Sequence, residues 1–167
     1  TDFNDGAAAQ QSLRDVTGTS VTPANLTISE TSPYNYGTLA TGSAQNHIFV
    51  VTNAGGFQAS AMAEVGLAPP YAFTGGVYPG TGGDCAGTLN AAATCNIDIE
   101  YSPGIVSAAD NETIDMQYND GNVLQNATRD VTGVAVTPAL ITITEADPYN
   151  YGTIATGSSL ALSLIPI

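Results

Sequence analysis

Apolar and polar residues alternate along much of the chain, which is the pattern of strands that have one buried and one solvent-facing side. The alternation is clearest in residues 95–101 and 114–119, and it recurs in residues 26–29. Residues 47–53 (HIFVVTN) form a longer apolar run, which predicts a more fully covered strand. The apolar members of the alternating segments, which we expect to lie in the core, are Leu26, Ile28, Cys95, Ile97, Ile99, Tyr101, Ile114, Met116 and Tyr118.

Turn signals separate these segments, and none of the segments has a helical period. The signals are Asn-Ala-Gly-Gly at 53–56, Pro-Pro at 69–70, Gly-Gly at 75–76 and 82–83, and Asn-Asp-Gly at 119–121. They leave room for about seven short strands in roughly 115 residues, which is the arrangement of an immunoglobulin domain. The sequence therefore predicts an all-β fold, an immunoglobulin-like antiparallel β-sandwich.

The chain repeats itself at a fixed interval. RDVTGTSVTPANLTISETSPYNYGTLATGS, which begins at Arg14, aligns without a gap with RDVTGVAVTPALITITEADPYNYGTIATGS, which begins at Arg129, at an offset of 115 residues. An interval of this length corresponds to a whole domain rather than to a solenoid unit. We therefore predict a tandem array in which residues 1–18 are the closing strand of a preceding repeat, 19–133 are a complete repeat and 134–167 are the opening strands of a following repeat.

Composition and charge narrow the range of partners. Fifteen acidic residues face two basic ones, so the formal net charge is −13. Nucleic acid is a poor partner for such a chain, because phosphate binding needs clustered Lys and Arg, and anionic lipid is disfavoured for the same reason. No apolar run reaches the ~18 residues of a membrane span, so we expect no direct membrane insertion. The abundance of Ser, Thr, Asn, Gly and β-branched residues is typical of an exported β-protein.

Cys85 and Cys95 are the only cysteines. Their spacing does not fit a CxxC metal or redox motif, so a local disulfide is favoured over two buried free thiols. A disulfide implies an oxidising compartment, and the prediction for localisation is extracellular or cell surface.

Candidate catalytic and metal-binding chemistry is sparse. A Ser-His-Asp or metal mechanism would have to use His47, the only histidine, but the position of His47 in an alternating strand favours a structural role. No G-x-S-x-G, P-loop or HExxH motif is present, so we expect neither an enzyme nor a cofactor. A calcium site is conceivable among five carboxylates, although a solvated acidic face is the preferred interpretation. These are Asp98, Glu100, Asp110, Glu112 and Asp115.

Two tyrosines and three sequons are the remaining candidates. Tyr34 and Tyr36 share one face of a strand and could form a stacking platform for sugar rings, or Tyr36 could pack in the core with Tyr34 at its rim. Their recurrence as Tyr149 and Tyr151 favours packing, because every repeat must begin in the same way. Asn25, Asn111 and Asn126 each stand in an N-glycosylation triplet.

Several segments together resemble the bacterial Ig-like repeats of the choice-of-anchor D group, relatives of the ASH-type domains found in Hydin. They are YNYGTLATGS, FVVTNAGG, CAGTLNAAATCNIDIEYSP, the YNDG turn and the closing VTG, and they span residues 19–133 in order. The sequence departs from the group in having Tyr36 where Phe is commoner and in its low basic content. The resemblance implies a non-catalytic module of large secreted or surface-attached bacterial proteins, often in tandem, with no catalytic residues to transfer.

Three functions fit these observations. The first is a structural spacer in a stalk, adhesin or fibre, whose partners are neighbouring repeats. The second is a module that binds a surface glycan or protein through end loops or the tyrosine face. The third is assembly by strand exchange between identical subunits, because segments 3–17 and 134–167 contain strands without partners in this chain.

Overall fold

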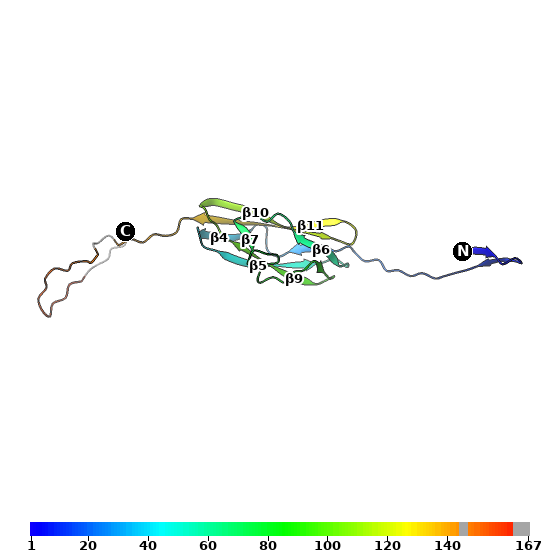
Figure 1. Ribbon diagram of the computed structural model, residues 1–167, viewed down its shortest axis with the longest axis horizontal. Helices are drawn as coiled ribbons and strands as arrows, with labels where there is room; N and C mark the ends of the chain where they lie inside the picture. Colours follow the sequence, from blue (N-terminus) through cyan, green and yellow to red (C-terminus); the bar gives the residue numbers. More distant parts are fainter. Residues whose placement is uncertain (144–146, 162–167) are drawn as a thin grey trace.

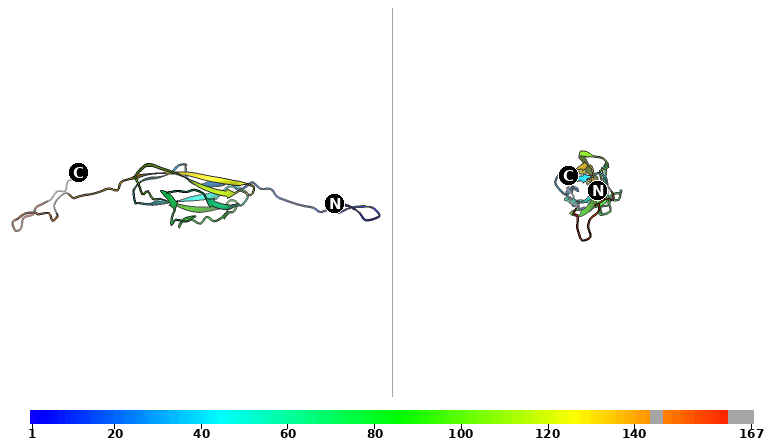
Figure 2. Two further views of the ribbon diagram at one scale, coloured as in Figure 1. Left: turned by 45° about the horizontal axis from the view of Figure 1, so that its top comes forward. Right: turned by 90° about the vertical axis from the view of Figure 1, so that its left-hand side faces the viewer.

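The computed structural model describes residues 1–143 and 147–161. Its elements are all strands and lie in two stacked sheets and one separate hairpin (Figures 1 and 2). One sheet has the order β4-β11-β10-β6-β8, the other has the order β3-β5-β9-β7, and β1 pairs with β2 alone. The strands are β1 (Asp2–Asn4), β2 (Ala9–Gln11), β3 (Leu26–Ile28), β4 (Tyr34–Ala40), β5 (Gln45–Asn53), β6 (Ala59–Glu64), β7 (Tyr71–Phe73), β8 (Thr88–Leu89), β9 (Thr94–Tyr101), β10 (Ser107–Asn119) and β11 (Leu124–Val136).

The predicted immunoglobulin-like sandwich is confirmed, with one pair of strands that is not antiparallel. β4 lies beside β11 and runs in the same direction, with Tyr34 opposite Val131 and Ala40 opposite Val136. The chain passes from β3 in one sheet to β4 in the other without reversing, and β4 therefore arrives parallel to the last strand. All other pairs in the two sheets are antiparallel.

The core lies between the two sheets, and all the predicted core residues are buried there. Successive side chains of a strand point to opposite faces, so the alternating residues of β9 and β10 place every second side chain between the sheets. The buried cluster runs from Ala24 to Val131 and draws no member from the described residues outside that range. Residues of the sandwich thus form a core of their own, independent of both terminal segments.

Three details of this sandwich were not predicted from the sequence. β5 is not covered on both faces, because Phe49 and Val51 point into the core while Ile48 and Val50 lie on the outer face. β11 continues to Val136, beyond the repeat boundary predicted at residue 133, and it remains paired with β4 over those last residues. The two sheets contain nine strands rather than about seven, because β7 and β8 are short segments within the loops that the turn signals marked.

The β1–β2 hairpin reproduces the tip of the β10–β11 hairpin at the 115-residue offset. Asp2 pairs with Gln11 as Gln117 pairs with Asn126. In both turns the aspartate side chain accepts two backbone N–H groups, which lowers the pKa of Asp5 and of Asp120. The exposure differs, however, since Phe3 is 52% exposed and its counterpart Tyr118 only 4%.

The segment after β11 likewise repeats the local geometry of β4. The amide N–H of Gly152 donates to the side chain of Asn150, as Gly37 does to Asn35, and both glycines have positive φ. The rings of Tyr149 and Tyr151 meet edge to face, as do those of Tyr34 and Tyr36. Apolar side chains that are buried in the complete unit are exposed in this segment, among them Ile141, Ile143 and Tyr151. No described residue belongs to a helix that is long and apolar enough to cross a membrane.

Candidate functional site

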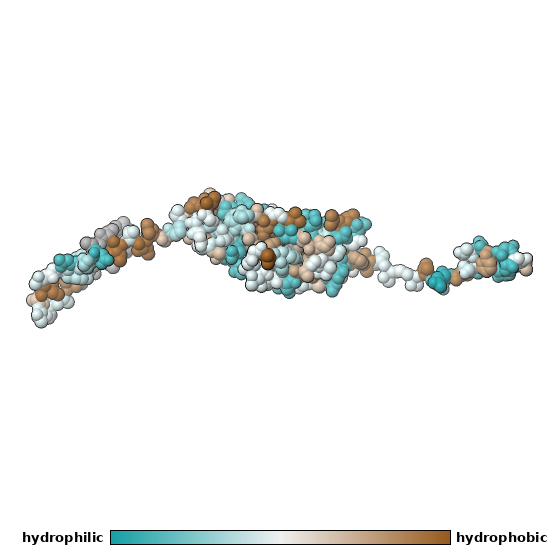
Figure 3. Space-filling model, viewed as in Figure 1, coloured by the Kyte–Doolittle hydropathy of each residue, from teal (hydrophilic) through white to brown (hydrophobic). Residues whose placement is uncertain are grey.

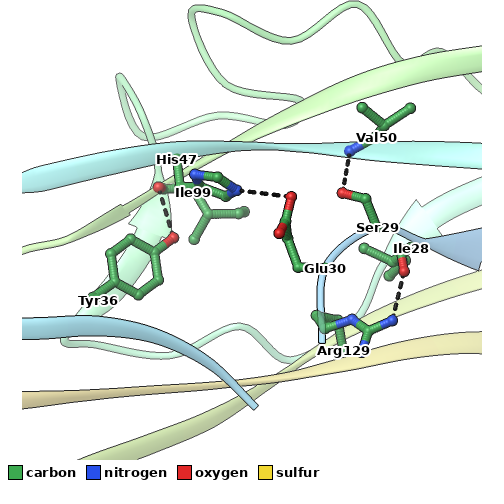
Figure 4. Close-up of polar contacts among 8 residues, drawn as sticks. All are labelled: Ile28, Ser29, Glu30, Tyr36, His47, Val50, Ile99 and Arg129. Atoms are coloured by element: carbon green, nitrogen blue, oxygen red, sulfur yellow. Dashed lines mark hydrogen bonds and ion pairs between the residues drawn. The ribbon is translucent and has the colours of Figure 1, made fainter. Parts of the chain in front are cut away.

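Tyr34 and His47 lie together where β4 begins. Their rings are stacked, with centroids 4.1 Å apart, and both meet the ring of Phe49 edge to face. The imidazole Nε2 lies 3.5 Å from the carboxylate of Glu30, in the turn before β4 (Figure 4). One face of the Tyr34 ring is therefore covered by His47. The contacts that hold the imidazole are the rings of Tyr34 and Phe49 and the carboxylate of Glu30.

Tyr36 packs in the core and does not form a stacking platform with Tyr34, as the sequence favoured over a sugar-binding pair. Its side chain is 3% exposed and packs against Tyr71 and Tyr101 between the sheets. Its hydroxyl donates to the carbonyl of Ile99 at 3.0 Å (Figure 4), and burial raises the pKa of this phenol. A sugar ring cannot reach a phenol whose ring lies between two sheets.

Arg129 ties the two sheets together beside this cluster. Its guanidinium extends from β11 and donates to the carbonyl of Ile28 at the end of β3, at 2.6 Å (Figure 4). The contact holds the point at which the chain leaves one sheet for the other. No role for this arginine was predicted from the sequence, where it belongs to the repeated RDVTG segment.

The five carboxylates proposed for a calcium site do not converge. Asp98 and Glu100 lie on β9, and the other three lie on β10 in the opposite sheet. Across residues 1–143 and 147–161, no group of three or more His, Cys, Asp or Glu side chains is placed to hold a metal ion. Asp110 instead accepts the hydroxyl of Tyr101 at 2.7 Å.

Asp98 also contradicts the predicted solvated acidic face, because it is only 2% exposed. The glycine-rich turn 80–83 covers it, and the amide N–H of Gly82 and the side chain of Asn46 donate to its carboxylate. A Cβ atom at Gly80 would come within 2.3 Å of the backbone carbonyl of Asp98. Only a residue without a side chain lets the turn approach β9 so closely.

An open groove lies over neighbouring residues of β10 and β11, beside Pro33, which directly precedes β4. It contains two carboxylates, an amide and a hydroxyl, and no basic side chain lines it. The lining residues are Pro33, Asn111, Glu112, Thr113, Asp130 and Val131. Hydrogen bonds from Thr113 and Ser32 engage the carboxylate of Asp130 and lower its pKa, so this side chain is already partnered within the fold.

The predicted disulfide between Cys85 and Cys95 is present. It joins the loop after the glycine-rich turn to the start of β9, and both cysteines are buried. Closing a loop of this length stabilises the fold by roughly 2–3 kcal/mol on the chain-entropy model. The bridge therefore fixes the loop that covers Asp98.

Asn25, Asn111 and Asn126 are all exposed, so the fold leaves the three sequons on the surface. Their surroundings differ. The side-chain amide of Asn126 donates to both carboxylate oxygens of Asp115, while Asn111 accepts the hydroxyl of Thr132. Whether any of the three carries a glycan stays a prediction.

Asn53 is a structurally central residue that the sequence analysis placed in a turn without giving it a role. It is fully buried at the end of β5. The side-chain oxygen Oδ1 of Asn53 accepts the backbone N–H groups of Asn25 and Gly55, and the two N–H groups of its side-chain amide donate to three backbone carbonyls, sharing one proton between two of them. Those carbonyls belong to Phe57, Leu89 and Asn90. In the sequence, the only signal for this role is that Asn53 ends an apolar strand and begins the Asn-Ala-Gly-Gly turn.

The comparisons with known proteins place the chain near several solved structures at low identity. No family model matches, and no curated protein matches. The VesB protease of Vibrio cholerae is 12% identical with a TM-score of 0.49, over 67% of this chain and 32% of that one. The ASH/PapD-like domain 7 of human CEP192 is 12% identical with a TM-score of 0.47, over 78% of this chain and 96% of that domain.

A protein of unknown function from Porphyromonas gingivalis W83 is also similar, at 12% identity and a TM-score of 0.45, over 65% of this chain and 46% of that one. This chain spans about a third of the length of the VesB protease that it matches. The assignment of the fold rests on the strand order and register described above. Within the described residues, the side-chain clusters are the packed, hydrogen-bonded contacts of a sandwich.

Proposed function

We propose that residues 21–136 form a non-catalytic, load-bearing spacer module in a tandem array of a secreted or surface-attached bacterial stalk, adhesin or fibre protein. One observation carries the proposal. The chain enters the sandwich at one end and leaves it at the other. β4, the first strand of its sheet along the chain, and β11, the last strand before the exit, are parallel neighbours. The disulfide and the exported composition support an extracellular setting.

The two ends can be named by their residues. The hairpin pole comprises Val21 and Thr22, the turn 53–57 and the tip 119–124 of β10–β11, because the N–H of Ala24 donates to Asp120 there. The exit pole comprises residues 41–43, 103–106 and Val136, because Thr41 donates to the carbonyl of Val136 and Gly42 to that of Pro103. Figure 1 shows the two poles at opposite ends of the sandwich.

This topology determines how tension acts on the fold. A pull on the chain before β3 first loads the short β3–β5 pair and then, through β3, draws β4 toward the hairpin pole. A pull on the chain after β11 draws β11 toward the exit pole. Parallel neighbours pulled in opposite directions slide along each other, so the whole ladder from Tyr34 to Ala40 shares the load. Pulling two antiparallel neighbours apart from one end would instead break their hydrogen bonds one after another.

We expect a higher unfolding force along the natural chain direction than in an unzipping direction. In single-molecule force spectroscopy the full chain would be held through cysteines at Ser20→Cys and Thr137→Cys. The matched control would be held through Gly104→Cys and Thr137→Cys, which load β10 and β11 from the same pole. All three positions are exposed, and a side chain at Gly104 meets no neighbour. Equal forces in the two geometries would contradict a load-bearing role.

We also propose that the terminal segments belong to adjacent repeats and that, where these are missing, they pair with a second copy of the chain by strand exchange. Support comes from the β1–β2 hairpin and the segment 147–158, which have the local geometry of a complete unit while Phe3 and Tyr151 are exposed. Strand edges with exposed apolar side chains are adhesive.

Strand exchange predicts that the full chain forms oligomers while residues 21–136 stay monomeric. Light scattering at about 0.15 M salt, where the repulsion between acidic chains is screened beyond about 8 Å, measures both masses. The shorter protein keeps every buried residue of the core cluster. Monomeric masses for both proteins would exclude strand exchange and would leave the spacer proposal untouched.

A further inference from the structure

The sequence VTPA stands at both ends of the sandwich, where one repeat meets the next. Val136, Thr137, Pro138 and Ala139 repeat the sequence of Val21, Thr22, Pro23 and Ala24. In the complete unit, the Thr22 hydroxyl accepts the N–H of Gly56 at 2.9 Å, and Ala24 donates to Asp120. A Cβ at Gly56 would lie 3.3 Å from that of Val21, so this stretch is packed onto the hairpin pole.

Val136 is at the same time the last residue of β11, and its carbonyl accepts the N–H of Thr41 at the exit pole. If the following repeat uses its VTPA stretch as this one does, Val136 contacts the exit pole of one sandwich and the hairpin pole of the next. Ala139, which would bind the next hairpin tip, is then at most about 10 Å along the chain from Val136. Such a junction contains no free linker.

Both poles carry exposed apolar side chains, which Figure 3 shows as brown surface at the two ends of the sandwich. At the exit pole, Ile105 is 78% exposed and Val106 is 58% exposed. At the hairpin pole, Phe57 and Val123 are each about half exposed. The ring of Phe57 packs against Gly121 in the turn between β10 and β11. The chain brings the exit pole of one repeat next to the hairpin pole of the following one. Contact between them would bury these apolar side chains, which is favourable.

We infer that consecutive repeats dock pole to pole, with the Ile105 and Val106 surface of one repeat packed on the hairpin pole of the next. The inference rests on the proposed spacer function and deepens it, because docking makes the array a stiff rod rather than a chain of hinged beads. The occupant of the exit pole is the next copy of the domain, delivered by Thr137 and Pro138. Proline limits the remaining freedom of this stretch because its φ is fixed.

A two-copy protein tests the docking. Residue 136 of the whole chain is joined to residue 22 of a second copy that continues to residue 167, which preserves the VTPA junction. Spin labels at Val77→Cys in both copies report the distance between the sandwiches by double electron–electron resonance, since Val77 is an exposed loop residue. We expect one narrow distance peak, and its loss when Ile105→Asp and Val106→Asp are placed in the first copy.

The matched control carries the same two substitutions in the second copy, where the exit pole faces no further sandwich. The control should keep the narrow peak, and the thermal unfolding temperature of each variant should match that of the parent because both side chains are exposed. A broad distribution in the parent, or a narrow peak in the first-copy variant, would overturn docking through this surface. The force measurement uses a single domain, so it can still support the spacer function if docking fails.

Discussion

Replacing Asn53 with alanine is expected to destabilise the sandwich by roughly 3–5 kcal/mol. The side chain is fully buried and forms five hydrogen bonds with backbone groups of three separate segments. Each lost bond costs on the order of 1 kcal/mol, and more where the backbone partner is left without water. The loss is comparable to a large share of the roughly 5–15 kcal/mol that holds a typical domain folded.

Urea unfolding followed by circular dichroism would measure this loss, with Asn35→Ala as the matched control. Asn35 is exposed, and its side chain accepts one local N–H, that of Gly37. Both substitutions delete the same atoms, so the comparison isolates the network around Asn53. We expect the control to lose less than about 1 kcal/mol. Similar losses for the two variants would show that the buried amide does not organise the hairpin pole.

The position of Asn53 also shows what the sequence could not predict. Alternation identified the buried residues of β9 and β10 because a strand places every second side chain on the same face. It could not identify the partners of Asn53 at Leu89 and Asn90, because they lie in β8 and directly after it, far away along the chain. Asp98 was misassigned for the same reason, since the turn that covers it starts at Gly80.

The parallel pairing of β4 with β11 could not be predicted from the sequence for a different reason. Periodicity shows which face of a strand is buried and does not show which sheet the strand joins. The transfer of the chain between sheets occurs over the residues between Ile28 and Tyr34, where Glu30 has positive φ and Arg129 holds the carbonyl of Ile28. The internal repeat, by contrast, is visible directly, because two segments 115 residues apart share their sequence.

Replacing Tyr36 with alanine is expected to cost roughly 3–5 kcal/mol, as for other large buried aromatic side chains. The ring packs against Tyr71 and Tyr101 between the sheets, and its hydroxyl donates to Ile99. Tyr36→Phe should cost about 1 kcal/mol, because it keeps the packing and leaves one buried carbonyl without its donor. The same urea unfolding series measures both variants.

Tyr34→Ala is the matched comparison, and its expected loss of about 1–2 kcal/mol is smaller because Tyr34 lies at the rim of the core with its ring stacked on His47. The order of the two losses separates the structural role of the repeated tyrosines from a binding role. A loss at Tyr34 larger than that at Tyr36 would contradict the assignment of Tyr36 to the core. If Tyr34→Ala instead abolished saturable binding on a glycan array while the fold stayed intact, the module would be a binding domain, and the recurrence of Tyr149 and Tyr151 would mark repeated binding sites.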